Sequence, residues 1–321
     1  MEIFVTVLLI ICGLVLIIYG GNLLVNNAVK ISKLTGIPEA IIGATIVALA
    51  TTLPELSVTV FSSMDNLNDM AIGNAIGSML FNITFIIGIC ITFSPEYCNK
   101  KTIKKNFYIL FLSIVFILIF GLTKGITKFE GWILIIVFIA YFVFNIFDVV
   151  KKVKIENFNM PIVKVVEKFD KKKLLAVAVA FIIGSFLVFW GGKLLVTNGS
   201  IMAKLLNLSD HIIGVTVVAI GTSLPEVVTS ISSIKHKCTS LAIGNTIGAN
   251  ILSSTLLVGT TAIISKETLF FDGNITNFAL PLLLFAMLVI YIPISKHNKT
   301  NKRQGIVLLL LSIIYYITLI F

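Results

Sequence analysis

Ten runs of mostly apolar residues constrain this chain more than any other feature of its sequence. Each run holds about 17 to 26 residues, and a helix needs about 20 to cross a bilayer. Irregular backbone cannot face lipid, so the runs predict helices. They lie at 3–20, 39–61, 70–94, 106–123, 130–148, 174–198, 211–233, 240–265, 275–295 and 305–321. Charged residues make up only 12% of the chain, against about 25% in soluble domains. We therefore predict an all-α polytopic membrane protein with ten transmembrane helices.

The basic residues predict how the chain is oriented. If the N-terminus is outside, the inner loops hold 20 Lys and Arg residues and the outer loops hold five. Cytoplasmic loops carry the excess of Lys and Arg, so both termini are predicted to be extracellular. This placement explains the net charge of +10 through membrane topology, and no nucleic-acid partner is expected. Residues 149–173 hold eight lysines and are predicted to be a cytoplasmic linker.

A repeat relates the two halves of the chain at a shift of 171 residues. Over 43–82 against 214–253, 15 of 40 positions are identical, including a Pro-Glu pair and a Gly-Asn pair. Each half holds five predicted spans, which is an odd number, so the second half enters the membrane in the opposite direction. We predict two inverted five-helix repeats, at 1–148 and 174–321. Such repeats are typical of secondary transporters, which bind their substrate near the midplane.

Two glutamates stand well inside the apolar runs and occupy matching positions of the repeat. Glu55 follows Pro54, and Glu226 follows Pro225. A carboxylate at this depth is costly and is by default functional, although a carboxylate satisfied by neighbouring hydroxyls is the alternative. Proline removes a donor, so each helix should break there and free the carbonyls of about Ala48 to Thr51 and of the matching turn.

Oxygen-bearing groups accompany each glutamate. Ala48, Thr51, Thr52 and Glu55 share one helix face, as do Ala219, Thr222, Ser223 and Glu226. The following helices place Asn74, Ser78 and Asn82 on one face, and Asn245, Ala249 and Ser253 on another. Close packing through the glycines of these helices is the alternative explanation, but it leaves the asparagines unexplained. Two ionised carboxylates balance one divalent or two monovalent cations, and hard cations prefer oxygen ligands.

These motifs resemble the two α-repeats of the Ca²⁺/cation antiporter superfamily, and most closely its prokaryotic sodium/calcium exchangers. The resemblance implies that the second and seventh helices break at the ion site, and that the long first and sixth helices slide to switch access. It implies Ca²⁺ bound by the two glutamates and the carbonyls of Thr51 and Thr222. The expected ion ligands are Glu55, Glu226, Thr51, Thr222, Thr52, Ser223, Ala48, Ala219, Ser78, Asn82 and Ser253.

The resemblance makes Na⁺/Ca²⁺ exchange at the plasma membrane of a prokaryote the leading hypothesis. Ala249 and Ser253 depart from the family pattern, which has Ser at the first position in many members and Asp or Asn at the second. The coupling ion therefore stays open, and a proton-coupled cation exchanger is the main alternative. A passive channel would need neither repeats nor broken helices, and an intramembrane hydrolase would need a nucleophile and a base. We expect no enzyme activity and no cofactor. The expected partners are the transported Ca²⁺ and Na⁺ and the lipid bilayer, with no obligate protein partner.

Overall fold

The computed structural model describes residues 2–320, except 36, 38, 65, 95–99, 124, 160–170, 206–218, 237 and 298. The described residues are almost entirely helical, and an isolated antiparallel bridge pairs Ile126 with Leu269. The prediction of an all-α protein is confirmed.

The elements before the predicted linker begin with one long helix and continue with a broken one. They are α1 (Glu2–Thr35), α2 (Glu39–Ile42), η1 (Gly43–Val47), α3 (Ala48–Thr51), α4 (Leu53–Met64), α5 (Asn68–Phe81), η2 (Asn82–Ile86), α6 (Ile87–Phe93), α7 (Lys100–Thr123) and α8 (Lys128–Asn159). The η elements are π-helical segments, which leave the regular i→i−4 hydrogen-bond pattern.

The elements after the predicted linker follow a similar order. They are α9 (Lys171–Leu205), α11 (Ala219–Thr222), α12 (Leu224–Lys235), α13 (Thr239–Leu252), η4 (Ser253–Leu257), α14 (Val258–Ile264), η5 (Ile275–Ala279), α15 (Leu280–His297) and α16 (Lys302–Ile320). Of the predicted linker, residues 149–159 continue α8 and 171–173 begin α9, and 160–170 lie outside the described residues.

Seven helices of the described residues are long and apolar enough to cross a membrane, or eight if the bent pair Gly43–Thr51 and Leu53–Met64 counts as one span. These eight match eight of the ten predicted spans. Part of the predicted seventh span, 211–218, lies outside the described residues, and the rest forms α11 and α12. The predicted tenth span corresponds to α16, a helix of 19 residues that is not among the eight.

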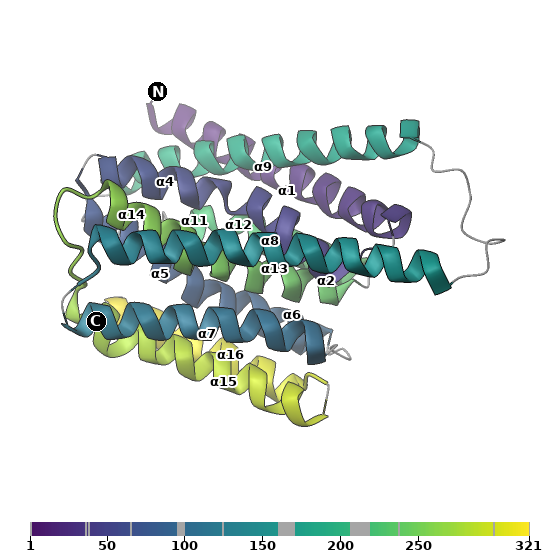
Figure 1. The fold of residues 1–321 in the computed structure, drawn as a ribbon. Coiled ribbons are helices and arrows are strands. Elements are labelled where there is room, and N and C mark those ends of the chain that lie inside the picture. Colours follow the sequence, from purple (N-terminus) through teal and green to yellow (C-terminus); the bar gives the residue numbers. More distant parts are fainter. Residues whose placement is uncertain are drawn as a thin grey trace.

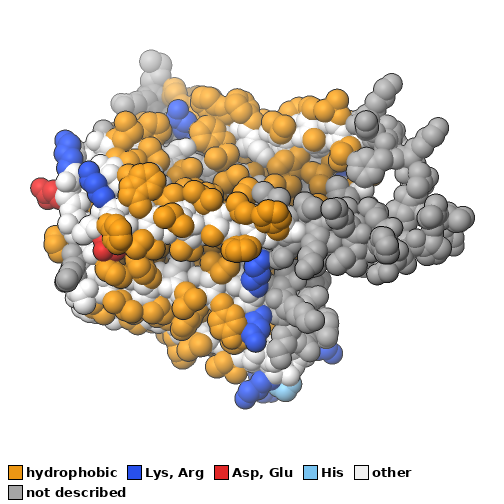
Figure 2. All heavy atoms as spheres, in the orientation of Figure 1, with side chains coloured by type: hydrophobic (Ala, Val, Ile, Leu, Met, Phe, Trp, Pro, Cys, Tyr) orange, Lys and Arg blue, Asp and Glu red, His pale blue; other side chains and the backbone are white. Residues whose placement is uncertain are grey.

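The surface of the helices matches a lipid environment. Large apolar side chains stand exposed along the helices, for example Phe4, Phe144 and Ile182. Figure 2 shows hydrophobic side chains over the middle of the visible face, while charged side chains gather mostly toward its two ends. An apolar belt between charged ends is what a bilayer requires of a protein that spans it.

Two long helices form a pair at one side of the bundle. α1 and α9 cross the top of the view in Figure 1 and pack along each other. Glycines bring their backbones together: a Cβ built on Gly184 would lie 3.0 Å from the carbonyl oxygen of Gly20, and one on Gly191 would lie 2.7 Å from that of Gly13. Small residues allow this close approach inside a membrane, where apolar area alone does not drive helices together.

The remaining helices surround a core built on α5 and α13, which carry Asn74 and Asn245. Buried apolar side chains of α5, α13, α14 and α15 form its largest cluster. α8 packs against α14, α16 against α6, and α15 against α7. α5 and α13 are therefore the most enclosed helices, and they hold the predicted polar residues away from lipid.

Candidate ion-binding site

The two predicted helix breaks occur at matching residues. α3 ends at Thr51 and α4 begins at Leu53, and their two helical segments meet at 52°. Thr52 lies between them with φ −82° and ψ 0°, and Ser223 has φ −85° and ψ 0° between α11 and α12. The break is confirmed in both halves, and its cause is the proline two residues later, which offers no N–H group to the preceding turn.

The carbonyl of Ala48 is not freed by the break, contrary to the prediction. It accepts a hydrogen bond from the backbone N–H of Thr52 at 2.9 Å, so the α-helical pattern persists through Thr52. The interruption starts later because Pro54 is the residue whose missing N–H would have bonded to Ala50. The hydroxyl of Thr51 also lies 3.3 Å from this carbonyl oxygen, and the role of Ala48 as an ion ligand stays a prediction.

The two glutamates are buried, and each is bonded to a residue of the other half. Glu55 is 1% exposed and Glu226 is fully buried. Ser223 donates its hydroxyl to Oε1 of Glu55 at 3.3 Å, and Thr52 donates to Oε1 of Glu226 at 3.5 Å. The second oxygen of each carboxylate has no hydrogen-bond partner. The breaks therefore bring both carboxylates to a junction between the halves.

The asparagines of α5 and α13 hold this junction together. Thr222 donates its hydroxyl to Oδ1 of Asn74 at 3.1 Å, and Thr51 donates to Oδ1 of Asn245 at 3.4 Å. The amide of Asn74 also donates to the backbone carbonyl of Glu55 at 3.3 Å. Protein groups therefore supply hydrogen-bond partners to Asn74 and Asn245, so the burial of these asparagines does not by itself require a bound cation.

Two threonines complete these contacts and were missed by the sequence reasoning. Asn74 donates to Oγ1 of Thr59 at 3.3 Å, and Asn245 donates to Oγ1 of Thr229 at 3.2 Å. Each threonine lies about one turn after a glutamate. The signal available in the sequence was that spacing alone, which is common in helices.

Ser78 and Asn82 each hold a buried oxygen without a hydrogen-bond partner, and their role as ion ligands stays a prediction. Both side chains are buried, and neither Oγ of Ser78 nor Oδ1 of Asn82 has a hydrogen-bond partner. With the two free carboxylate oxygens, four predicted ligands each hold an unpaired buried oxygen. An unpaired buried polar group costs about 1–3 kcal/mol, so a bound cation would stabilise this arrangement.

The structure gives less support to the remaining predicted ligands. Ser253 is buried and begins the π-helix η4, just as Asn82, 171 residues earlier, begins η2. Ala219 begins α11 and contributes no side-chain oxygen, so its ligand would be a backbone carbonyl. Ala249, which is not a predicted ligand, is buried on α13.

The ligand set has few charges. No group of three or more His, Cys, Asp or Glu side chains gathers anywhere in the part of the chain that the structure describes. A site at this junction would rely on two carboxylates and on neutral oxygens. Such a set suits Na⁺ or Ca²⁺, both hard cations, and does not suit Zn²⁺, which prefers nitrogen and sulfur ligands.

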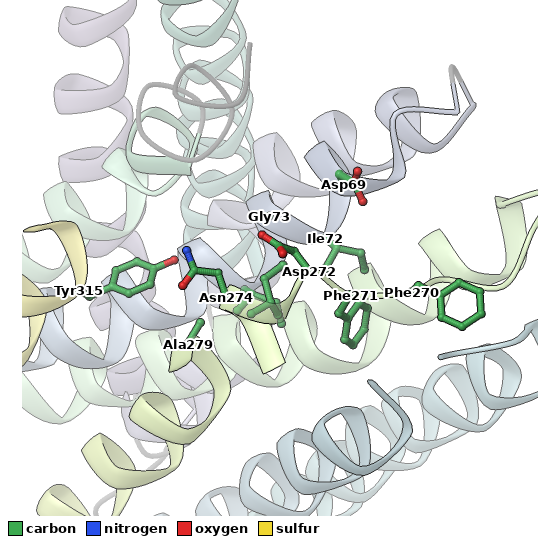
Figure 3. A pocket seen from close by; sticks show the side chains of 11 residues that line it. Asp69, Ile72, Gly73, Phe270, Phe271, Asp272, Asn274, Ala279 and Tyr315 are labelled. Atoms are coloured by element: carbon green, nitrogen blue, oxygen red, sulfur yellow. The ribbon is translucent and has the colours of Figure 1, made fainter. Parts of the chain in front are cut away.

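A separate cavity of about 150 Å³ lies beside α5 and does not include the predicted ligands (Figure 3). Its walls are mainly apolar and aromatic, with Phe270, Phe271 and Tyr315, and two acidic residues, Asp69 and Asp272, also line it. Gly73 lies on its wall next to Asn74 in the sequence. This cavity is therefore separate from the candidate ion ligands.

Known proteins resemble this chain over almost all of its length. An uncharacterised membrane protein of Methanocaldococcus jannaschii is 31% identical, with 94% of each chain covered. Sodium/calcium exchanger MaX1 of Methanosarcina acetivorans is 26% identical, with 99% of each chain covered. Among solved structures, the sodium–calcium exchanger NCX_Mj soaked with Na⁺ and no Ca²⁺ aligns with a TM-score of 0.83 and 29% identity, covering 99% of each chain.

The family described as sodium/calcium exchanger protein matches this chain in two segments, residues 5–147 and 176–321. These segments contain both broken helices and both asparagine-bearing helices. The match spans most of the chain, and it fits a multi-pass membrane protein with two buried carboxylates at a junction of its halves. This chain therefore belongs to the sodium/calcium exchanger protein family.

Proposed function

We propose that this protein is a secondary active antiporter that exchanges Na⁺ for Ca²⁺ across the plasma membrane by alternating access. The observation that carries this proposal is the pair of buried glutamates, each with one oxygen bonded to a hydroxyl of the opposite half and one oxygen unpaired. A buried ionised carboxylate without a counter-charge costs several kcal/mol. Each glutamate therefore needs either a cation or a proton.

The charge of the site supports competition between the two ions. Two ionised carboxylates hold a charge of −2, which one Ca²⁺ or two Na⁺ would balance. The hydroxyl partners of Glu55 and Glu226 are neutral, so they orient the carboxylates without cancelling this charge. If the ions share ligands, binding of one excludes the other, and this mutual exclusion couples their movements.

The proposed architecture is ten transmembrane helices in two inverted five-helix repeats, with both termini outside. Its support is the agreement of matching positions: the breaks at Thr52 and Ser223 have the same backbone angles, and η2 and η4 begin 171 residues apart. The hydrogen bonds between the halves also come in matching pairs. The bond from Thr52 to Glu226 corresponds to the bond from Ser223 to Glu55, and each half also donates a threonine hydroxyl to an asparagine of the other half. Inverted halves that meet at their broken helices would place the carboxylates near the midplane.

Ion uptake into proteoliposomes tests the proposal. Vesicles loaded with Na⁺ and diluted into Na⁺-free buffer should take up ⁴⁵Ca²⁺, and vesicles without the Na⁺ gradient should not. Glu55→Gln and Glu226→Gln keep the size of the side chain and remove its charge, so each should reduce uptake to the level of protein-free vesicles. Normal uptake by both variants would exclude the glutamates as the ion site.

A proton-coupled cation exchanger is the second candidate, and the chemistry of the second half favours it. Ala249 provides no hydroxyl, and Ser253 provides no carboxylate, so that half offers fewer oxygens for Na⁺. Uptake driven by a pH gradient in the absence of Na⁺ would identify this function. Uptake that needs neither gradient would instead indicate a passive channel.

A further inference from the structure

Asn250 is a buried asparagine on α13 that none of the expected ligands includes, and it connects the two halves beside the candidate site. Its side chain is fully buried. Its amide nitrogen donates to the backbone carbonyl of Met79 at 3.0 Å, and its Oδ1 accepts a hydrogen bond from the amide nitrogen of Asn82 at 3.0 Å. Asn82 is one of the predicted ion ligands, and its own Oδ1 has no partner.

The donors and acceptors in these contacts allow only one orientation of the side-chain amides of Asn250 and Asn82. A backbone carbonyl can only accept, so Asn250 must present its NH₂ group to Met79. The oxygen of Asn250 then lies toward Asn82, and Asn82 must present its own NH₂ group to that oxygen. The oxygen of Asn82 is consequently directed away from Asn250. A single backbone carbonyl thus determines the orientation of two amides in sequence.

The place of this contact in the fold fits a role at the ion site. Asn82 begins the π-helix η2, and its backbone N–H lies against the carbonyls of Ser78 and Met79. π-helical turns inside α-helices are frequent at functional sites. Ser78, one turn before Asn82, also has an unpaired buried oxygen. An amide oxygen can bind a cation, whereas an NH₂ group in the same place would repel it.

We propose that Asn250 is a positioning residue that fixes the amide of Asn82 with its oxygen, and not its NH₂ group, available to the transported cation. This inference rests on the proposed function for the identity of the ions. It assigns Asn250 no direct contact with them.

The first test replaces Asn250 by methionine, the residue at the matching position 79 of the first half. Asn250→Met keeps a side chain of similar size and removes both hydrogen bonds, so the amide of Asn82 becomes free to turn over. The half-saturating concentration of Na⁺ or of Ca²⁺ for uptake should rise about tenfold, because the cation loses its contact with the oxygen of Asn82 when that amide turns over. The matched control is Asn145→Met on α8, because Asn145 is also buried and its amide donates to the carbonyl of Tyr141 in its own helix.

A second substitution separates positioning from general packing. Asn82→Asp has two oxygens and no NH₂ group, so its orientation cannot be wrong, but it places an acceptor against the oxygen of Asn250. Adding Asn250→Met to Asn82→Asp should therefore leave cation half-saturation unchanged or lower it. A purely structural role predicts the opposite, namely that Asn250→Met weakens binding in both backgrounds.

A third variant keeps the test decisive if Asn250→Met does not fold. Asn250→Asp retains an acceptor facing Asn82, replaces the donor to the Met79 carbonyl by a second acceptor, and adds a negative charge that attracts the cation. It should bind the cation at least as tightly as the wild type. Tenfold weaker binding by Asn250→Asp would overturn the proposal, as would unchanged half-saturation of both ions in well-folded Asn250→Met.

The failure of this inference can be told apart from the failure of the proposed function. Stabilisation of the detergent-purified protein by added Ca²⁺ or Na⁺, measured as a rise in its unfolding temperature, reports binding without transport. If wild-type vesicles show no Na⁺-driven uptake but Asn250→Met weakens this stabilisation about tenfold, exchange is refuted and the positioning role stands. If uptake is Na⁺-driven and Asn250→Met changes neither readout, the positioning role alone is refuted.

Discussion

At the scale of single residues, hydroxyls and amides of one half form hydrogen bonds with the candidate ion-site residues of the other. The hydroxyls of Thr52 and Ser223 donate hydrogen bonds to the two carboxylates. Those of Thr51 and Thr222 donate to the two asparagines. The types of these residues and their spacing were readable in the sequence. Their partners were not, because each bond joins residues more than 140 positions apart, and only the packing of the two breaks against each other brings them together.

Thr51→Val should destabilise the protein because it removes a hydroxyl that lies within hydrogen-bonding distance of both the carbonyl of Ala48 and Oδ1 of Asn245, and it leaves Oδ1 of Asn245 buried without that donor. We expect a loss of about 1–3 kcal/mol, seen as a lower thermal unfolding temperature in detergent. Thr45→Val is the matched control, since the Thr45 hydroxyl bonds only carbonyls one turn earlier in its own helix. Equal effects of the two substitutions on the unfolding temperature would mean that the bond between the halves contributes no more to stability than a bond within one helix.

Ser253→Asp should change the Na⁺ dependence of uptake more than the Ca²⁺ affinity. It adds a carboxylate at the buried start of η4, in the half where Ala249 and Ser253 offer few oxygens. About a tenfold lower half-saturating Na⁺ concentration is expected, with little change for Ca²⁺. Ser253→Asn is the control for size without charge. A large change in Ca²⁺ affinity with unaltered Na⁺ dependence would show that this position has been misassigned.

At the scale of elements, the helix breaks could be predicted and the π-helical segments could not. A proline inside an apolar run forces a break through its own covalent structure, and both breaks occur where Pro54 and Pro225 predict them. The segments η1, η2 and η4 carry no comparable signal, because they consist of ordinary residues, and a tertiary contact such as one at η1 cannot be read from the sequence. That contact is made by Tyr141 of α8, which donates its hydroxyl to the carbonyl of Ala44 in η1 at 2.8 Å.

Gly43→Ala should disturb the packing of η1 against α13. A Cβ on Gly43 would lie 2.4 Å from the carbonyl oxygen of Leu241 and 2.9 Å from the backbone nitrogen of Asn245, and neither backbone atom can move alone. Overpacking of this kind costs about 1–3 kcal/mol, which a thermal unfolding curve would detect. Gly273→Ala is the control, because its nearest contact would be at 3.5 Å. Gly43→Ala as stable as that control would mean that α13 can shift freely away from η1.

At the scale of the whole molecule, the pair of α1 and α9 is the part best placed to move. These helices pack on each other through glycines along their length and expose much of their surface. They also meet the broken helices at two matching glycines: a Cβ on Gly21 would lie 2.8 Å from Val228, and one on Gly192 would lie 2.9 Å from Pro54. Val228 and Pro54 lie within two residues of Glu226 and Glu55. The family resemblance implies that these two helices slide, and the glycine contacts identify where such sliding would pass the candidate site.

Gly192→Ala should therefore slow turnover more than it weakens ion binding. The added methyl group meets the ring of Pro54, a side chain held by the helix break, and movement of α9 past that ring would require the break to yield. We expect the maximal rate of ⁴⁵Ca²⁺ uptake to fall about tenfold while the half-saturating Ca²⁺ concentration changes less than twofold, since the methyl group lies against the proline and not against a carboxylate. Gly21→Ala, at the matching position against Val228, should give a milder version of the same result because a valine side chain can rotate. An increase in half-saturating Ca²⁺ at an unchanged maximal rate would show instead that Gly192 shapes the ion site, and that α9 does not pass Pro54 during transport.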